Sequence, residues 1–285
     1  MRKLICSIYC LIGLTYTQAQ TGLPIQQDVM PGLINPALQG ISEGISAGLL
    51  YNVQWVGIDG APTLSALSGA YRFKQHSAGV WIARDAFGKL TTDEIHLQYA
   101  FHLQVGNGQL TGGIDGYYQQ QAYNFQQVNV PLIGDPALAQ LKYTTSNITG
   151  GIAYMHPKGY FGISAQNMIS NAQNDDMFRH PSVNLFATGL YVYTLSDDWK
   201  IMPGLTYRLP VGSPSVVYIQ GHVQYHEKIQ LDFGYRHAGT YQLGMRWNII
   251  PKVQFWYSYA YDTAFSSTSA AGGHEVGLRY GTTFY

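Results

Sequence analysis

The chain has 285 residues, of which only 11% are charged, whereas Gly (32 residues) and Tyr (23 residues) are abundant. So few charges are unusual for the surface of an ordinary soluble protein. Basic and acidic residues number 16 each, so no net positive charge exists to attract phosphates, and we exclude nucleic acid as a partner.

Residues 1–19 are predicted to be a signal peptide for export. Arg2 and Lys3 precede an apolar run over residues 4–14, and Thr17-Gln18-Ala19 resembles a small-x-small cleavage site before Gln20. The run is about half of the ~20 residues that a membrane-spanning helix needs, and no later stretch is longer. The sequence therefore does not predict an α-helical membrane protein.

Both cysteines, Cys6 and Cys10, lie in this segment. The mature chain is thus predicted to have neither a disulfide nor a thiolate metal site. A lipoprotein is a weak alternative, because the bulky Tyr9 precedes Cys10 where a small residue is expected. Residues 20–44 have no strand pattern, and we expect this segment either to plug a lumen or to reach periplasmic partners.

From residue 45 to the end, apolar residues recur with a period of two. Between Ile95 and Val105, for example, one face is apolar and the other carries His and Gln. Each segment is about as long as the ~9–11 residues with which a tilted strand crosses a bilayer. The predicted strands lie near 45–55, 62–72, 77–86, 94–105, 109–119, 147–155, 159–167, 182–193, 199–208, 215–225, 229–237, 240–250, 253–262 and 274–284. Residues 45–285 are therefore predicted to form an all-β fold, an antiparallel up-and-down transmembrane β-barrel of about 14 strands.

The connections support this interpretation, because short turns alternate with a set that contains every long loop, near 120–146, 168–181 and 263–273. Outer-membrane barrels have short periplasmic turns and longer external loops, and an even strand number places both termini in the periplasm. A soluble secreted β-sandwich is the alternative fold. The many aromatic residues near strand ends and the terminal Phe284-Tyr285 favour an outer-membrane barrel surrounded by lipid.

The inner face of the barrel is predicted to carry several ionisable residues, which either meet lumenal water or pair with one another. A defined ligand site is the less favoured explanation. No metal or cofactor is expected, because the histidines lack partners at ligand spacing. The residues concerned are His96, His102, His222, Asp232, Arg236, Arg246, Glu275 and Arg279.

His180-Pro181-Ser182 is similar to the His-x-Ser pair of outer-membrane phospholipase A, in which the two side chains act as base and nucleophile. Here a proline separates them after a polar loop. A turn is the better interpretation, and we predict that the protein is not an enzyme.

One segment gives a more specific indication of the protein's relatives than the composition of the chain does. Residues 54–63, Gln-Trp-Val-Gly-Ile-Asp-Gly-Ala-Pro-Thr, resemble the hallmark of the PorP/SprF family of type IX secretion membrane proteins. Residues 33–40, Leu-Ile-Asn-Pro-Ala-Leu-Gln-Gly, resemble that family's asparagine-proline-alanine segment, although Leu38 replaces its usual tyrosine. Residues 274–280 resemble its closing strand.

The resemblance implies a barrel in the outer membrane of Bacteroidota that works with other type IX secretion components. Its implied partner is a secreted, adhesin-type surface protein, bound through a C-terminal sorting domain and secreted or held outside. The candidate partner-binding residues form one external loop, whose Asp-Gly turn and proline limit its freedom; a loop that caps the barrel is the competing interpretation. These residues are Trp55, Val56, Gly57, Ile58, Asp59, Gly60, Ala61 and Pro62. A channel or a transporter of hydrophobic small molecules is the alternative function.

Overall fold

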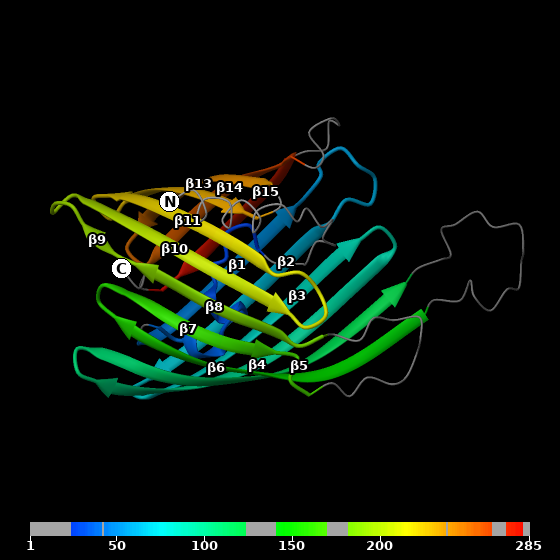
Figure 1. The fold of residues 1–285 in the computed structure, drawn as a ribbon, viewed down its shortest axis with the longest axis horizontal. Coiled ribbons are helices and arrows are strands. Elements are labelled where there is room, and N and C mark those ends of the chain that lie inside the picture. The colour runs from blue at the N-terminus through cyan, green and yellow to red at the C-terminus, as the bar shows by residue number, and fades with distance from the viewer. Residues whose placement is uncertain are drawn as a thin grey trace, which may run out of the picture.

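The computed structural model describes residues 24–41, 43–123, 141–169, 182–237, 239–263 and 272–281. Its strands form one closed antiparallel β-barrel with 14 strand positions around the ring (Figure 1). The strands are β1 (Gly44–Val53), β2 (Thr63–Phe73), β3 (His76–Phe87), β4 (Leu90–Val105), β5 (Gly108–Tyr123), β6 (Leu141–His156), β7 (Gly159–Gln166), β8 (Asn184–Tyr191), β9 (Tyr193–Thr194), β10 (Trp199–Pro210), β11 (Val216–Tyr225), β12 (Ile229–Arg236), β13 (Thr240–Ile250), β14 (Val253–Asp262) and β15 (Gly272–Tyr280). Two short 3-10 helices, η1 (Pro31–Leu33) and η2 (Pro36–Leu38), precede them.

Each strand pairs with its neighbour in the chain, and β1 pairs with β15 to close the ring. Strands β8 and β9 both pair with β10, so together they occupy one strand position in the ring, interrupted at Val192. The backbone N–H of Val192 instead donates to the carbonyl of Lys158, 2.7 Å away. The predicted barrel is confirmed, and the two-sheet sandwich is wrong.

Every predicted strand overlaps an observed one, but three strands are longer than expected. Strand β4 starts at Leu90, β5 continues to Tyr123 and β6 starts at Leu141, so the ends of the loop predicted over 120–146 are strand. The last strand ends at Tyr280, and the predicted continuation over 282–284 lies outside the described residues. The predicted signal peptide lies outside them as well.

The two faces of the sheet differ as the alternation predicts. Along β4, the side chains of Ile95, Leu97 and Leu103 are 46–67% exposed, whereas those of His96 and His102 are at most 6% exposed. Exposed apolar residues on the outer face of a closed barrel fit contact with lipid chains. No helix among the described residues is long and apolar enough to cross a membrane.

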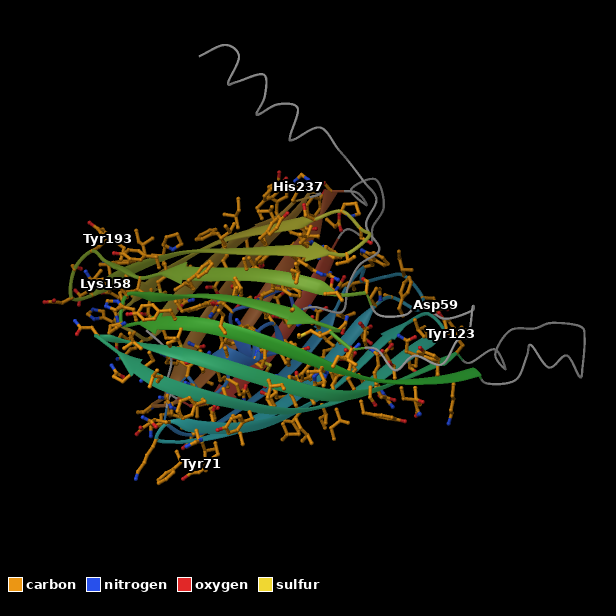
Figure 2. The ribbon with its side chains drawn as sticks, turned by 60° about the horizontal axis from the view of Figure 1, so that its bottom comes forward. Asp59, Tyr71, Tyr123, Lys158, Tyr193 and His237 are labelled. Atoms are coloured by element: carbon orange, nitrogen blue, oxygen red, sulfur yellow. The ribbon has the colours of Figure 1, made fainter. Side chains whose placement is uncertain are left out.

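The barrel has a short-turn end and a long-loop end. Figure 2 shows Lys158 and Tyr193 at the short-turn end and Asp59 and Tyr123 at the long-loop end. The short turns face the periplasm in outer-membrane barrels, so the long-loop end is the external one.

Residues 24–41, called the inner segment from here on, lie inside the ring of strands (Figure 1, darkest blue). Near the long-loop end, the N–H of Ile25 donates to Glu275 of β15, and near the short-turn end the carbonyl of Ile41 accepts from Arg72 of β2. The barrel itself begins and ends at the short-turn end, as expected. The described part of the inner segment, however, begins in the long-loop half of the lumen and runs toward the short-turn end, where β1 starts.

Candidate functional site

A buried cluster of charges fixes the upper part of the inner segment. Arg246 of β13 donates to Asp28 of the inner segment and to Asp232 of β12, with N–O distances of 2.8 and 2.9 Å. His222 of β11 lies 2.5 Å from Asp232 and 3.7 Å from Asp28. Burial opposes the charge of Asp28, but Arg246 and His222 outweigh it and hold the pKa of Asp28 below its ordinary value. The cluster therefore ties the inner segment to three strands by charge.

Glu275 provides a second attachment. Its carboxylate accepts from the backbone N–H groups of Ile25 and Gln26 at 2.6 and 3.1 Å. It also accepts from the Asn52 amide at 3.1 Å and the Trp256 indole at 3.3 Å. A fully buried carboxylate is costly unless donors surround it, and half of these donors belong to the inner segment. The buried carboxylate of Glu275 thus needs the donors of the inner segment, and Glu275 in turn holds that segment in place.

The asparagine-proline-alanine turn fills the middle of the lumen. Asn35 caps η2 by accepting from the N–H of Ala37, and its side-chain amide donates to the carbonyls of Ile152 and Ile163 on β6 and β7. Glycines of the facing wall lie closest to the turn: a Cβ at Gly113 would lie 2.3 Å from the N atom of Ala37, and one at Gly151 would lie 2.1 Å from Oδ1 of Asn35. These glycines allow the turn to approach the sheet.

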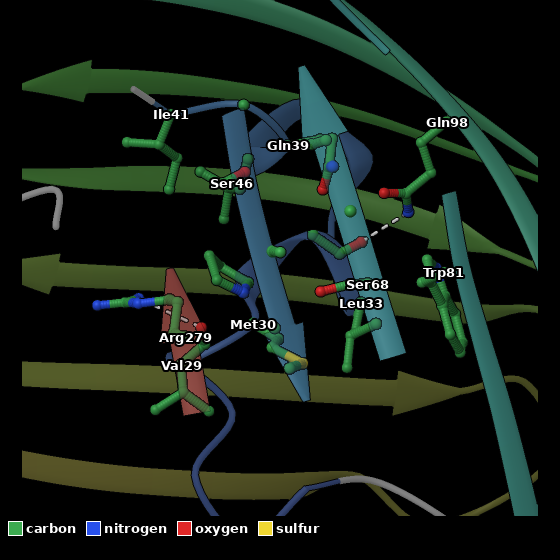
Figure 3. A pocket seen from close by; sticks show the side chains of 18 of the residues that line it. Val29, Met30, Leu33, Gln39, Ile41, Ser46, Ser68, Trp81, Gln98 and Arg279 are labelled. Carbon is green, nitrogen blue, oxygen red and sulfur yellow. Dashed lines mark hydrogen bonds between the residues drawn. The ribbon is translucent and has the colours of Figure 1, made fainter. Parts of the chain in front are cut away.

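Further strand side chains bind the backbone of the inner segment. Gln98 donates to the carbonyl of Gly32 at 2.9 Å, and Arg279 donates to that of Val29 at 3.3 Å (Figure 3). Close to the short-turn end, Arg72 donates to the carbonyls of Gly40 and Ile41 at 3.2 and 2.8 Å. Polar strand residues therefore satisfy the irregular backbone inside the barrel.

All eight inner-face residues named from the sequence lie on the predicted face, where we expected them either beside lumenal water or paired with one another. For His96, His102, His222, Asp232, Arg246 and Glu275 the structure shows the second outcome, because their side chains are at most 6% exposed and are bound by protein groups. Asp28 and Asn35, which complete the site, were missed as functional residues. The sequence signal of Asp28 is polarity within a segment that lacks a strand pattern, whereas Asn35 belongs to the asparagine-proline-alanine segment of the resemblance.

Two cavities remain beside the inner segment. One of about 100 Å³ lies between it and strands β1 to β3, next to Met30, Ser68 and Arg279 (Figure 3). The other, of about 270 Å³, lies toward the long-loop end and is lined by Glu94, Asp115 and other polar residues. Neither cavity is lined by the candidate partner-binding loop.

That loop, residues 54–62, folds onto its neighbours at the long-loop end. The N–H of Val56 donates to the carbonyl of Gly272, and the carbonyl of Gly60 accepts from the N–H of Gly88. Gly57 and Gly60 both have a positive φ, and a Cβ at Gly60 would lie 2.9 Å from the Cα of Gly88. The loop is therefore a defined structure fixed at both sides.

The tip of the loop is exposed, whereas Trp55 at its start is half-buried. The ring of Trp55 packs edge-on against Phe87 at 5.8 Å. Val56 and Ile58 are 43% and 44% exposed instead, and Asp59 is exposed beside them. Gly57 and Gly60 are exposed as well, whereas Ala61 and Pro62 are half-buried. The apolar surface available to a partner is that of Val56 and Ile58.

The structure describes one residue of the lipase-like pair. Ser182 is exposed, and its carbonyl accepts from the amides of Asn167 and Asn184, while His180 lies outside the described residues. Within the described ranges, no group of three or more His, Cys, Asp or Glu residues is placed to hold a metal ion.

Replacing Asp28 by Ala is expected to destabilise the barrel by about 3–5 kcal/mol, because Arg246 and His222 lose a buried countercharge. The measurement is the temperature at which the compact barrel unfolds on SDS gels. Asp93→Ala is the matched control, since its pair with Arg84 lies on the exposed outer face and contributes at most about 1 kcal/mol. Equal midpoints for the two variants would contradict the role of the buried cluster.

The comparisons with known proteins agree with this architecture. The model of the family described as type IX secretion system membrane protein PorP/SprF matches residues 23–280. No curated protein matches the chain.

Among solved structures, the toluene transporter TbuX of Ralstonia pickettii is similar with a TM-score of 0.54 and 10% identity, over 94% of this chain and 96% of that one. The outer membrane protein Omp33 of Acinetobacter baumannii has a TM-score of 0.53 and 8% identity, over 86% and 100%. At these identities the likeness shows the outer-membrane barrel fold alone. The family match covers nearly the whole described barrel, and the chain therefore belongs to the PorP/SprF family of type IX secretion system membrane proteins.

Proposed function

We propose that this barrel is a non-enzymatic component of the type IX secretion system that binds a secreted surface protein at the long-loop end. The partner is an adhesin-type cargo recognised through its C-terminal sorting domain, and binding aids its secretion or its attachment to the cell surface. The family match is the observation that carries this proposal.

Two structural features support binding rather than conduction. The inner segment occupies the lumen and is hydrogen-bonded to strands all around it, among them β2, β6 and β15. At the same time, the loop over residues 54–62 presents Val56 and Ile58 on a fixed backbone. A preorganised apolar tip loses little conformational entropy when a partner covers it.

A Val56→Ser, Ile58→Ser double variant is expected to reduce recovery of the cargo with the tagged barrel at least about tenfold, because central apolar contacts dominate interfaces. The measurement is affinity purification from native outer membranes followed by quantitative mass spectrometry. Val211→Ser is the matched control, because Val211 is 59% exposed in another connection at the same end.

Recovery of a large secreted protein with a C-terminal sorting domain, lost only in the double variant, would support the proposal and assign the loop. Recovery of no such protein with the unaltered barrel would contradict the proposed function. Equal recovery with all three proteins would leave the barrel as a cargo binder but reject the loop as the binding surface.

A further inference from the structure

The larger cavity, called the vestibule from here on, opens toward the long-loop end. Its walls come mainly from the inner faces of β3, β4 and β5, and Pro24 and Leu33 of the inner segment also line it. Exposure falls from rim to floor: the side chain of Glu94 is 25% exposed, whereas those of His96 and Asp115 are 7% and 5% exposed. The described walls of the vestibule therefore run from a partly exposed rim to a buried floor.

The vestibule is acidic. Asp85, Glu94 and Asp115 line it together with a single guanidinium, that of Arg208. Arg208 donates through Nε and Nη2 to the side-chain oxygen of Asn184 at 3.0 and 2.8 Å, so its hydrogen bonds are directed away from the carboxylates. Carboxylates in a cavity partly shielded from water attract a cation more strongly than carboxylates in bulk water do.

Three deeply buried polar atoms of residues that line the vestibule have no hydrogen-bond partner among the described residues. They are Oδ1 of Asp115, Nε2 of His96 and Nε1 of Trp81, whose residues are 4%, 6% and 9% exposed. Nε2 of His96 lies 3.5 Å from the Glu94 carboxylate, which leaves the Asp115 oxygen as an acceptor and the Trp81 nitrogen as a donor. The other oxygen of Asp115 accepts from His96 at 2.8 Å and from Gln98 at 3.1 Å. Because buried polar groups are rarely left unpaired, this acceptor and this donor indicate a ligand that carries N–H groups and an oxygen.

The geometry favours a basic side chain over other ligands. The ring of His96 stacks on Trp81 at 3.5 Å and on Tyr117 at 4.5 Å, so these stacked ring faces are not free to hold a sugar. The described residues here do not form a metal site. The volume of about 270 Å³ is sufficient for a single extended side chain.

We propose that the vestibule binds the cationic head of an arginine or lysine side chain inserted from outside by a partner polypeptide. Glu94 and Asp85 at the rim attract the cation, Asp115 accepts an N–H from it at the floor, and the Trp81 indole donates to a carbonyl of the inserted chain. That the inserted chain belongs to a secreted protein rests on the function proposed above. The binding of the cation rests on the vestibule alone.

The test uses the purified full barrel in detergent at low ionic strength, with N-acetyl-arginine methylamide as the probe. Calorimetry is expected to show saturable binding, and at least about tenfold weaker binding of the citrulline analogue, which has nearly the same shape but no charge. The same tenfold loss is expected for an Asp85→Asn, Glu94→Gln double variant. Asp93→Asn is the matched control, because it removes one carboxylate from the outer face of the same strand.

Binding must also weaken as salt is raised, since the rim charges are partly exposed. Equal affinity of the barrel for the arginine and citrulline analogues would overturn the proposal. This comparison uses the unaltered barrel, so it does not depend on whether a variant folds. Unchanged binding in the double variant, with its compact mobility on SDS gels retained, would overturn it as well. Arginine binding without any co-purified cargo would support the vestibule as a cation site and contradict the proposed function. Cargo recovery without arginine binding would support the proposed function and contradict the cation site.

Discussion

Deleting residues 24–40 is expected to convert the closed barrel into an ion-conducting pore. The inner segment occupies the lumen from Ile25 beside Glu275 to Ile41 beside Arg72, and its removal leaves a wide ring lined by polar and charged side chains. The strand ladders do not depend on the deleted residues, so the barrel itself should persist. Water would then hydrate Asp232, His222 and Arg246, as in the polar lumen of porins. Single-channel recording in planar bilayers measures the change.

The intact protein in the same preparation is the control, and it should show no stepwise conductance. A deletion variant that keeps the compact mobility of a folded barrel but does not conduct would show that the inner segment is not what closes the lumen. Conductance through the intact protein would instead favour the channel alternative and weigh against a filled barrel.

Replacing Gly113 by Val is expected to displace the asparagine-proline-alanine turn. The new Cβ would lie 2.3 Å from backbone atoms of Pro36 and Ala37, a distance that no rotamer change relieves. Overpacking of this kind costs about 1–3 kcal/mol or more, and loss of the Asn35 hydrogen bonds to β6 and β7 adds to it. Limited proteolysis of the purified barrel should therefore cut the inner segment much faster than in the unaltered protein.

Gly112→Val is the matched control, because Gly112 neighbours Gly113 on β5 but faces outward, where a Cβ meets nothing within 4 Å. Both variants carry the same cost of a β-branched residue in a strand, so the difference reports the lumenal clash. Equal protection of the inner segment in the two variants would show that the turn adapts to the extra methyl groups.

The sequence predicted the strands of the barrel because the side chains of each strand must alternate between lipid and lumen. It underestimated β4, β5 and β6, since stretches such as Thr91–Glu94 and Gln119–Gln121 are polar on both faces and carry no period of two. These strand ends project beyond the part of the barrel in which contact with lipid imposes the alternation. The pattern therefore reveals where a strand crosses the bilayer better than where it ends.

The inner site was less predictable than the fold. Inward-facing charges such as Asp232 and Glu275 follow from periodicity, but their partners Asp28 and Ile25 are more than 200 residues away in the chain and belong to an irregular segment. No local propensity encodes such pairing. The external loop was located correctly by its motif, yet the half-burial of Trp55 depends on Phe87 of another hairpin, which the motif does not contain.

The position of Glu275 constrains how the barrel assembles. Glu275 lies opposite Asn52 in the seam between the last strand and the first, and both side chains join the hydrogen-bond network around Ile25. The strand pairing that closes the ring thus also completes the contacts of the inner segment. In a barrel closed around an empty lumen, Glu275 would keep the Asn52 and Trp256 donors but lose those of Ile25 and Gln26, so the inner segment stabilises this seam.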